Sequence, residues 1–297
     1  PKSPDVMIQS GKELVLVTRK SPLALVQADL ASVCFEKAIP GTSIRIDKMV
    51  TTGDKRREWS LEKEGGKGLF TKELEDALLE NRADFAVHSA KDLPSDMPDG
   101  LAIAGFLPRE SAEDMLILSE GVESPKVIAT GSPRRRIQLR YLYPEAEFIE
   151  IRGNVDTRLN KIAEGYADAT MLAAAGLKRL GIDGWEGVTF KRLSLDECIP
   201  AVGQAAVAIQ CREEDVATYA GALDYSTNVA VRLERAFMER LGGGCQVAFA
   251  VNYTDEKLRI YHRQCGKEMR TIPFDYATKK PNEIADQLIR QLELGDA

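Results

Sequence analysis

The sequence predicts an α/β fold with two similar lobes, followed by a small α+β domain. Short apolar runs alternate with helical segments through most of the chain, which is the pattern of largely parallel sheets covered by helices on both faces. A second series of such units begins near residue 127, and the apolar segment at 207–210 then returns toward the first series. Two lobes joined by a chain that crosses over and back are expected to enclose a cleft.

The composition excludes several classes of protein. The chain has 297 residues, enough for two or three domains, and its net charge of -6 and pI near 5.3 argue against general nucleic-acid binding. No apolar run is long enough to span a bilayer, and the N-terminus lacks the apolar core of a signal peptide. The five cysteines are widely spaced without a Cys-x-x-Cys pair, so we expect reduced thiols, no metal site and a cytosol-like compartment: Cys34, Cys198, Cys211, Cys245 and Cys265.

The first lobe opens with a buried strand at 13–19 that leads directly into a helix. Ser21 is expected to cap this helix, with Pro22 at its first position. Arg19 and Ser21 lie at the junction, where backbone N–H groups and the helix dipole attract anions. The periodicity places one set of residues on the inward face of the helix: Leu23, Val26, Leu30, Val33 and Cys34.

The stretch from Thr51 to Lys67 is polar, highly charged and glycine-ended. This composition predicts a mobile lid or, with equal support, a plain solvated linker. Thr71 then begins a helix with the pattern of a capping box.

A strand at 85–87 ends in a polar segment that contains Lys91 and Asp92. A carboxylate at the end of a strand could act as a general acid or stabilise a developing cation. An Asx turn before Pro94 is the more common interpretation of such a segment on its own. The local sequence therefore leaves the role of Asp92 open.

Arginines recur where strands of both predicted sheets end. The carboxyl ends of parallel strands are where ligands bind, and the planar guanidinium matches a carboxylate or phosphate. Any single arginine is usually a surface ion-pairing residue, but the set as a whole predicts a ligand with many separate negative charges. The set is Arg19, Arg134, Arg135, Arg152, Arg158 and, in a loop-like setting, Arg179.

Three consecutive glycines, Gly242 to Gly244, separate a predicted helix from a strand at 247–251 and present Cys245. A thiol on such a turn is well placed for covalent chemistry. On this stretch alone a glycine cap followed by a small buried residue is the simpler interpretation, because free cysteine is usually a small hydrophobic residue.

Eight segments together resemble the hydroxymethylbilane synthase, or porphobilinogen deaminase, family. Each one alone is weakly specific, but they occur in the family's order between about residues 14 and 250. They read TRKSPLA (18–24), GGKGLF (65–70), HSAKDLP (88–94), GSPRR (131–135), IRGNVDTR (151–158), AAGLKRL (174–180), PAVGQ (200–204) and GGCQ (243–246).

The resemblance implies three domains. Residues 1–110 and 206–226 would form the first and residues 111–205 the second, both like the lobes of a type II periplasmic binding protein with a central cleft. Residues 227–297 would form a small α+β third domain. A solute-binding protein with the same two lobes is the main alternative, but it gives no role to Cys245. A ligand-sensing regulator is the second alternative, but the sequence has no DNA-binding helix-turn-helix or basic segment.

The resemblance also implies the chemistry. Porphobilinogen would be polymerised on a dipyrromethane cofactor attached to Cys245 through a thioether, with Asp92 as the catalytic carboxylate and no metal. The protein is expected to be a cytoplasmic monomer without nucleic-acid or membrane partners, or a plastid protein after loss of a transit peptide. Residues implied to bind the cofactor and the growing pyrrole chain are Arg19, Ser21, Lys67, Ser89, Lys91, Thr130, Ser132, Arg134, Arg135, Arg152, Gly153, Arg158, Arg179 and Gln204.

A few positions depart from the family's pattern. Ala205 stands where glycine is more common, which is expected to stiffen a hinge, and Pro133 replaces a residue that is usually leucine. Arg136 adds a third arginine to the second arginine-rich turn. None of these changes removes a chemical group that the implied reaction needs.

Overall fold

The computed structural model describes residues 11–55, 70–241 and 248–295. These residues fall into two compact units. The first unit contains the chain up to Lys55, from Phe70 to Arg109 and from Ala206 to Asn228; the second contains residues from Glu110 to Ala205 and from Val229 onward. The chain therefore leaves the first unit and returns to it, as the sequence predicts.

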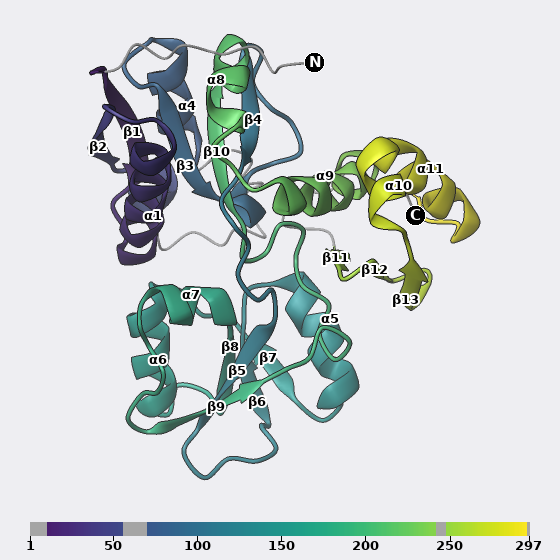
Figure 1. The fold of residues 1–297 in the computed structure, drawn as a ribbon. Helices are drawn as coiled ribbons and strands as arrows, with labels where there is room; N and C mark the ends of the chain where they lie inside the picture. The colour runs from purple at the N-terminus through teal and green to yellow at the C-terminus, as the bar shows by residue number, and fades with distance from the viewer. Residues whose placement is uncertain (1–10, 56–69, 242–247, 296–297) are drawn as a thin grey trace. The chain divides into compact units, whose positions relative to one another are not determined.

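The first unit is built on a five-stranded sheet of order β2-β1-β3-β10-β4 (Figure 1). Its strands β1, β2 and β3 are parallel, and β10 runs antiparallel to both of its neighbours. Its elements are β1 (Glu13–Arg19), α1 (Pro22–Ala38), β2 (Ser43–Met49), α2 (Thr52–Lys55), α4 (Lys72–Leu79), β3 (Phe85–Ser89), η1 (Ala90–Asp92), β4 (Leu101–Phe106), β10 (Val207–Arg212), η2 (Glu213–Asp215) and α8 (Val216–Ala220).

Helices cover both faces of this sheet. On one face Phe35 of α1 packs against Phe85 of β3 and Tyr219 of α8, with ring centroids 4.7 and 5.6 Å away. On the other face Leu74 and Leu78 of α4 pack against the sheet. The central strands β1, β3 and β10 are thus buried on both faces, which explains their apolar sequences, whereas the edge strand β2 is more polar and has no fully buried residue.

The inward face predicted for α1 is wrong in part. Leu30 and Val33 are exposed, at 46% and 65%, while Gln27, Ala28, Ala31 and Phe35 are buried. The apolar residues of this helix do not form one stripe, so periodicity alone misplaced Leu30 and Val33, while Cys34 packs against the core. Two other local predictions also fail: Thr52–Lys55 is a helical turn rather than loop, and Thr71 makes no side-chain cap.

The second unit contains another five-stranded sheet, of order β7-β6-β8-β5-β9. Strands β6, β7 and β8 are parallel, whereas β5 runs antiparallel to β8 and β9. The elements of this part are β5 (Asp114–Ser119), β6 (Val127–Ala129), α5 (Pro133–Leu142), β7 (Glu147–Ile149), α6 (Val155–Ala163), β8 (Ala169–Ala173), α7 (Ala174–Arg179) and β9 (Val188–Arg192).

The two five-stranded sheets have the same topology. In each, the antiparallel strand is the one that enters from the other unit along the chain: β10 in the first sheet and β5 in the second. These crossing strands make both sheets mixed, where the sequence pattern alone predicts largely parallel ones. The α/β class and the return of residues 207–210 to the first sheet are confirmed.

The C-terminal part of the second unit is a small α+β assembly, as predicted. The antiparallel sheet β11-β12-β13 packs with α9 and two terminal helices around a core that includes Phe237, Ile260 and Ile284. Buried Glu234 of α9 accepts hydrogen bonds from the backbone N–H of Gly203 and of Tyr253, at 2.8 and 2.9 Å. The elements are α9 (Tyr225–Arg240), β11 (Ala250–Thr254), β12 (Lys257–His262), β13 (Gly266–Thr271), α10 (Phe274–Lys279) and α11 (Pro281–Gln291).

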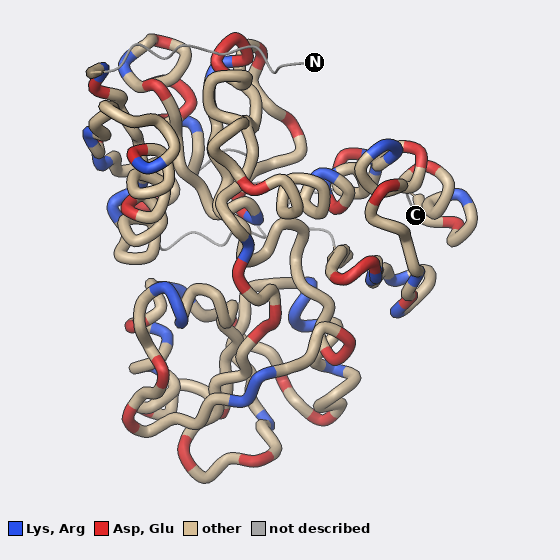
Figure 2. Tube along the Cα trace, viewed as in Figure 1, with Lys and Arg blue, Asp and Glu red and all other residues tan. Residues whose placement is uncertain are grey.

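Charged residues of both signs are interspersed along the described chain (Figure 2). No helix among the described residues is long and apolar enough to cross a membrane.

Candidate active site

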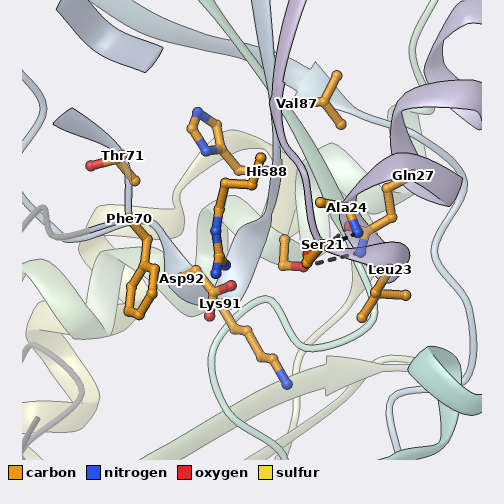
Figure 3. Close-up of a pocket in the computed structure, with 12 residues that line it drawn as sticks. Ser21, Leu23, Ala24, Gln27, Phe70, Thr71, Val87, His88, Lys91 and Asp92 are labelled. Carbon is orange, nitrogen blue, oxygen red and sulfur yellow. Dashed lines mark hydrogen bonds between the residues drawn. The ribbon is translucent and has the colours of Figure 1, made fainter. Parts of the chain in front are cut away.

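A hollow in the first unit lies at the carboxyl ends of β1 and β3 (Figure 3). These strands are parallel neighbours, so the segments that follow them meet at one edge of the sheet. The hollow is lined by Arg19, Ser21, Leu23, Ala24, Gln27, Phe70, Thr71, Val87, His88, Ser89, Lys91 and Asp92. The structure thus brings together the five predicted site residues that lie in the described part of this unit: Arg19, Ser21, Ser89, Lys91 and Asp92.

The strand-to-helix junction after β1 forms as predicted. Ser21 is the N-cap of α1 and its hydroxyl accepts a hydrogen bond from the backbone N–H of Ala24 at 3.4 Å, with Pro22 in the first turn. One turn later, the buried amide of Gln27 exchanges hydrogen bonds with the hydroxyl of Ser89, at 3.1 and 3.2 Å. This contact ties the start of α1 to the end of β3, and the sequence analysis missed Gln27.

Asp92 ends a short 3₁₀ turn that directly follows β3. Its side chain is exposed and lines the hollow, together with the half-buried Lys91. The backbone at Leu93 is extended, with φ -75° and ψ 126°, as expected for a residue before proline. The turn therefore presents the carboxylate at the sheet edge, close in sequence to the cationic Lys91.

Arg19 is held in the hollow by a carboxylate that the sequence analysis did not single out. Its Nε donates to Oδ2 of Asp54 at 3.2 Å, and its Nη2 donates to Oδ1 of the same residue. The ring of Phe70 lies against the guanidinium, 4.4 Å from Cζ to the ring centroid. Burial acts to raise the pKa of Asp54, but hydrogen bonds from Arg19 and Thr51 outweigh it, so this pKa lies below its ordinary value.

In the second unit, the arginines of α5 surround a buried carboxylate. Arg134 and Arg135 donate to opposite oxygens of Asp114 at 2.8 and 2.7 Å. Gln204 donates to Asp114 at 3.1 Å and accepts from Arg134 at 3.3 Å. Burial acts to raise the pKa of Asp114, but the two guanidinium groups dominate and hold it well below its usual range.

This network changes how the α5 arginines are understood. Arg134 and Arg135 are 6% and 7% exposed, and Gln204 is fully buried. Their visible contacts stabilise the fold of the second unit, including a bond from Arg134 to the carbonyl of Ile199 at 2.9 Å. Their predicted binding of a ligand stays a prediction. Asp114 is a charged residue at the start of an apolar strand. Because a buried charge needs a partner of opposite charge, this position was the sequence signal for an ion pair with an arginine.

The remaining arginines follow other strands of the same sheet. Arg152 and Gly153 follow β7, and Gly153 has a φ of 119° that favours glycine. Arg158 donates from Nε to the carbonyl of Gly153 at 2.8 Å. Arg179 ends α7 after β8 and donates from Nη2 to the carbonyl of Ala205 at 2.6 Å. Because β6, β7 and β8 are parallel, all these segments lie at one edge of the sheet.

The second unit also contains the predicted residues Thr130 and Ser132. Ser132 is the N-cap of α5, its hydroxyl accepting from the backbone N–H of Arg135 at 3.3 Å, and its own N–H donates to the hydroxyl of Thr130 at 3.2 Å. Lys67, Cys245 and residues 56–67 of the predicted lid lie outside the described residues.

Residues 14–220 match the family model described as "Porphobilinogen deaminase, dipyromethane cofactor binding domain". The porphobilinogen deaminase of Prochlorococcus marinus is 38% identical over 96% of this chain and 94% of that protein. The porphobilinogen deaminase of Syntrophotalea carbinolica is 43% identical over 82% of this chain and 79% of that protein. That of Sulfurimonas denitrificans is 41% identical over 81% of this chain and 79% of that protein.

Among solved structures, the effector-binding domain of BenM with benzoate matches 73% of this chain and 90% of its own, at 16% identity and a TM-score of 0.44. An ancestral arginine-binding protein bound to arginine matches 71% of this chain and 90% of its own, at 13% identity and a TM-score of 0.41. The sequence matches, which cover most of the chain at 38–43% identity, decide the family. The chain belongs to the porphobilinogen deaminase family.

Proposed function

We propose that this protein is a hydroxymethylbilane synthase that condenses four porphobilinogen molecules, with loss of ammonia, and releases linear hydroxymethylbilane for tetrapyrrole synthesis. The observation that carries the proposal is the hollow of the first unit, which is lined by the carboxylate of Asp92 and by the cations of Arg19 and Lys91 in a member of this family. A ligand with both carboxylates and a ring that becomes positively charged needs both kinds of group.

The described residues fit a cofactor that carries carboxylates, as dipyrromethane does. The Nε of Arg179 is buried and has no hydrogen-bond partner among the described residues. Burial lowers the pKa of Arg179, which marks a guanidinium short of compensating partners. Arg152 makes no side-chain ion pair within the described part of the chain. These two residues would bind the carboxylates of the cofactor, and the cofactor, when bound, supplies the pyrrole carbon from which the product grows.

Asp92 would stabilise the charge that develops during the reaction. Loss of ammonia from the aminomethyl group of porphobilinogen leaves positive charge spread over the pyrrole ring and its nitrogen. A carboxylate fixed at the end of a strand interacts more strongly with this charged state than with the neutral substrate, so it lowers the barrier. Arg19 and Lys91 would hold the acetate and propionate groups of the substrate so that the ring lies against Asp92.

Cys245 would carry the cofactor through a thioether. The four cysteines in the described part of the chain are poor candidates, because burial raises the pKa of each thiol and disfavours the reactive thiolate. For Cys198 and Cys211 that pKa is about 12. The protein would act as a cytoplasmic monomer with the three domains proposed from the sequence, at residues 1–110 with 206–226, 111–205 and 227–297.

The proposal is tested by intact mass and by turnover. We expect the denatured protein to carry the added mass of a dipyrromethane and to react with Ehrlich's aldehyde reagent, and we expect porphobilinogen to be consumed with release of ammonia. Cys245→Ser should have the unmodified mass and no activity, while the matched control Cys34→Ser should keep both. Absence of turnover by protein that carries the adduct, or an adduct on another cysteine, would overturn the corresponding part of the proposal.

A further inference from the structure

Three polar side chains form a buried chain of hydrogen bonds that ends at the hollow of the first unit. Nε2 of Gln210 donates to Oε1 of Glu75 at 3.1 Å, and Oε1 of Gln210 lies 2.7 Å from Nε2 of His88. Glu75, Gln210 and His88 are 7%, 0% and 6% exposed. His88 lines the hollow, and Figure 3 shows its ring in the group of side chains that includes Phe70 and Asp92.

The pairing of two strands in the sheet places His88 and Gln210 next to each other. Strands β3 and β10 pair antiparallel with His88 opposite Ala208, which places Gln210 two residues further along the same face. Both are polar residues within apolar strands, and the structure pairs one with the other. Buried polar groups that satisfy each other in this way fix a single arrangement.

The hydrogen bonds among Glu75, Gln210 and His88 determine which nitrogen of His88 carries the proton. The two close contacts of the Gln210 amide nitrogen are Oε1 of Glu75 and, at 2.8 Å, the sulfur of Met97, both of which accept hydrogen bonds. The amide oxygen therefore faces His88, so Nε2 of the imidazole must be the donor. In the neutral ring, Nδ1 is then an acceptor, and it is the nitrogen left to interact with a molecule in the hollow.

The surroundings keep this imidazole neutral. Burial lowers the pKa of His88 to about 4, against the smaller opposing effects of Gln210 and Asp92, and Arg19 lowers it further. Since the ring remains uncharged near neutral pH, it does not repel a cation that forms beside it.

We propose that His88 is a second acceptor for the ring N–H of the pyrrole substrate, acting beside Asp92, and that Gln210 and Glu75 fix the tautomer it needs. This proposal rests on the proposed function and adds a residue that determines specificity for a pyrrole ring. As positive charge spreads onto the ring nitrogen, its N–H becomes more acidic and its hydrogen bond to a neutral imidazole strengthens. The contact is therefore worth more in the charged state than with bound substrate.

Nitrogen NMR of the two imidazoles tests the first half of the proposal in the free protein. The chain has two histidines, and His262→Gln leaves the signals of His88 alone. We expect one protonated and one unprotonated nitrogen, with the proton on Nε2, at pH 7. Gln210→Leu should release the tautomer to a mixture. A single Nδ1–H tautomer or a charged ring in the wild-type protein would overturn the proposal.

A non-reactive probe tests the contact with the ligand. In the first titration the probe is a porphobilinogen analogue with methyl in place of aminomethyl, which cannot lose ammonia. In the second it is the corresponding furan, which keeps the carboxylates but has no ring N–H. We expect the Nδ1 signal to shift with the pyrrole and to stay in place with the furan. Equal shifts with both, or no shift when the pyrrole is bound, would contradict the proposal.

Two substitutions separate the role of Nδ1 from that of the buried chain. His88→Asn keeps an acceptor near the position of Nδ1 but loses the bond to Gln210, whereas His88→Gln keeps a partner for Gln210 and loses the Nδ1 acceptor. We expect kcat/KM to fall roughly 10- to 100-fold in His88→Gln, as for loss of a hydrogen bond to a charged group, and clearly less in His88→Asn. The reverse order would show that His88 acts only through Gln210.

These measurements also distinguish failure of the proposal from failure of the proposed function. The tautomer and the binding shifts are measured without turnover, and His262→Gln should keep the wild-type rate. If the wild-type protein binds the pyrrole probe but does not consume porphobilinogen, the proposed function fails while the acceptor role of His88 is still decided by the probes.

Discussion

Asp54 binds the guanidinium of Arg19 along one edge, in the wall of the hollow. Nε donates to Oδ2 at 3.2 Å and Nη2 donates to Oδ1, while the hydroxyl of Thr51 donates to the same carboxylate at 2.7 Å. A guanidinium has five N–H groups, so this pair uses only part of its capacity. Asp54 therefore orients Arg19 while leaving donors that can bind a ligand's carboxylate.

Asp54→Asn is expected to weaken both the fold and the binding of substrate. The amide keeps the shape but cannot hold both nitrogens of Arg19, so we expect the free energy of unfolding to fall by about 1–2 kcal/mol. The KM for porphobilinogen should rise, because Arg19 loses its fixed orientation. Chemical denaturation and steady-state kinetics measure the two effects.

Asp47→Asn is the matched control. Asp47 pairs with Arg45 at 3.3 Å, but both side chains are well exposed, at 42% and 53%. Such a pair contributes about 0–1 kcal/mol, so the control should change little. Equal losses in the two variants would show that the burial of the Arg19–Asp54 pair is of no consequence.

Asp114→Asn is expected to destabilise the second unit severely. It would leave the guanidinium groups of Arg134 and Arg135 buried without their counter-charge, which costs about 3–5 kcal/mol. Denaturant unfolding checks this value, with exposed Asp183→Asn as the control. A loss below that of the control would mean that the two arginines find other partners at no cost.

Acid should remove the stabilisation by Asp114. Its pKa is lower in the folded protein than in the unfolded chain, so its contribution is present above the unfolded pKa of about 4 and is lost as the pH falls toward the folded value. The difference in unfolding free energy between wild type and Asp114→Asn should therefore be constant above about pH 5 and shrink below pH 4. If this difference in unfolding free energy instead grew on acidification, the pKa of Asp114 would be raised by folding and the prediction would be wrong.

Arg152→Leu and Arg134→Leu should fail in different ways. Arg134 balances the charge of Asp114, so its loss should lower the free energy of unfolding. Arg152 has no such partner among the described residues, so its loss should leave stability within about 0.5 kcal/mol and impair cofactor retention or elongation. Intact mass reports whether each variant retains the cofactor, and denaturant unfolding reports its stability. An Arg134→Leu protein that is stable but lacks the cofactor would contradict this prediction and show that Arg134 binds the cofactor.

The sequence predicts the class of the fold and the edges of the sheets where ligand-binding residues lie. Strand ends can be located from apolar runs, and this places Arg19, Lys91 and Asp92 at the end of a strand. What the sequence could not supply was the partner of each charged residue. Asp54 lies 35 positions from Arg19, and Asp114 lies 20 and 21 positions from the two arginines it binds, so only the fold brings these partners together.

Local rules failed where tertiary contacts decided the outcome. The exposed Leu30 and Val33 show that an apolar residue on a helix need not face the core. Ala205 has a φ of 70° that favours glycine, and its carbonyl accepts from Arg179, while its expected stiffening of a hinge stays a prediction. The hydrogen bond from Arg179, and not the conformational preference of alanine, therefore accounts for the backbone conformation at Ala205.

The rate of the Asp92→Asn protein tests the central claim most directly. Asparagine keeps the shape of the exposed side chain in the hollow and removes its charge, so stability and cofactor content should be unchanged. A contact worth about 3–5 kcal/mol in the transition state predicts a loss of roughly two to four orders of magnitude in kcat, with a smaller change in KM. Asp92→Glu, which keeps the charge, should retain part of the activity. Turnover of Asp92→Asn near the wild-type rate would contradict the account and make Asp92 a turn residue only.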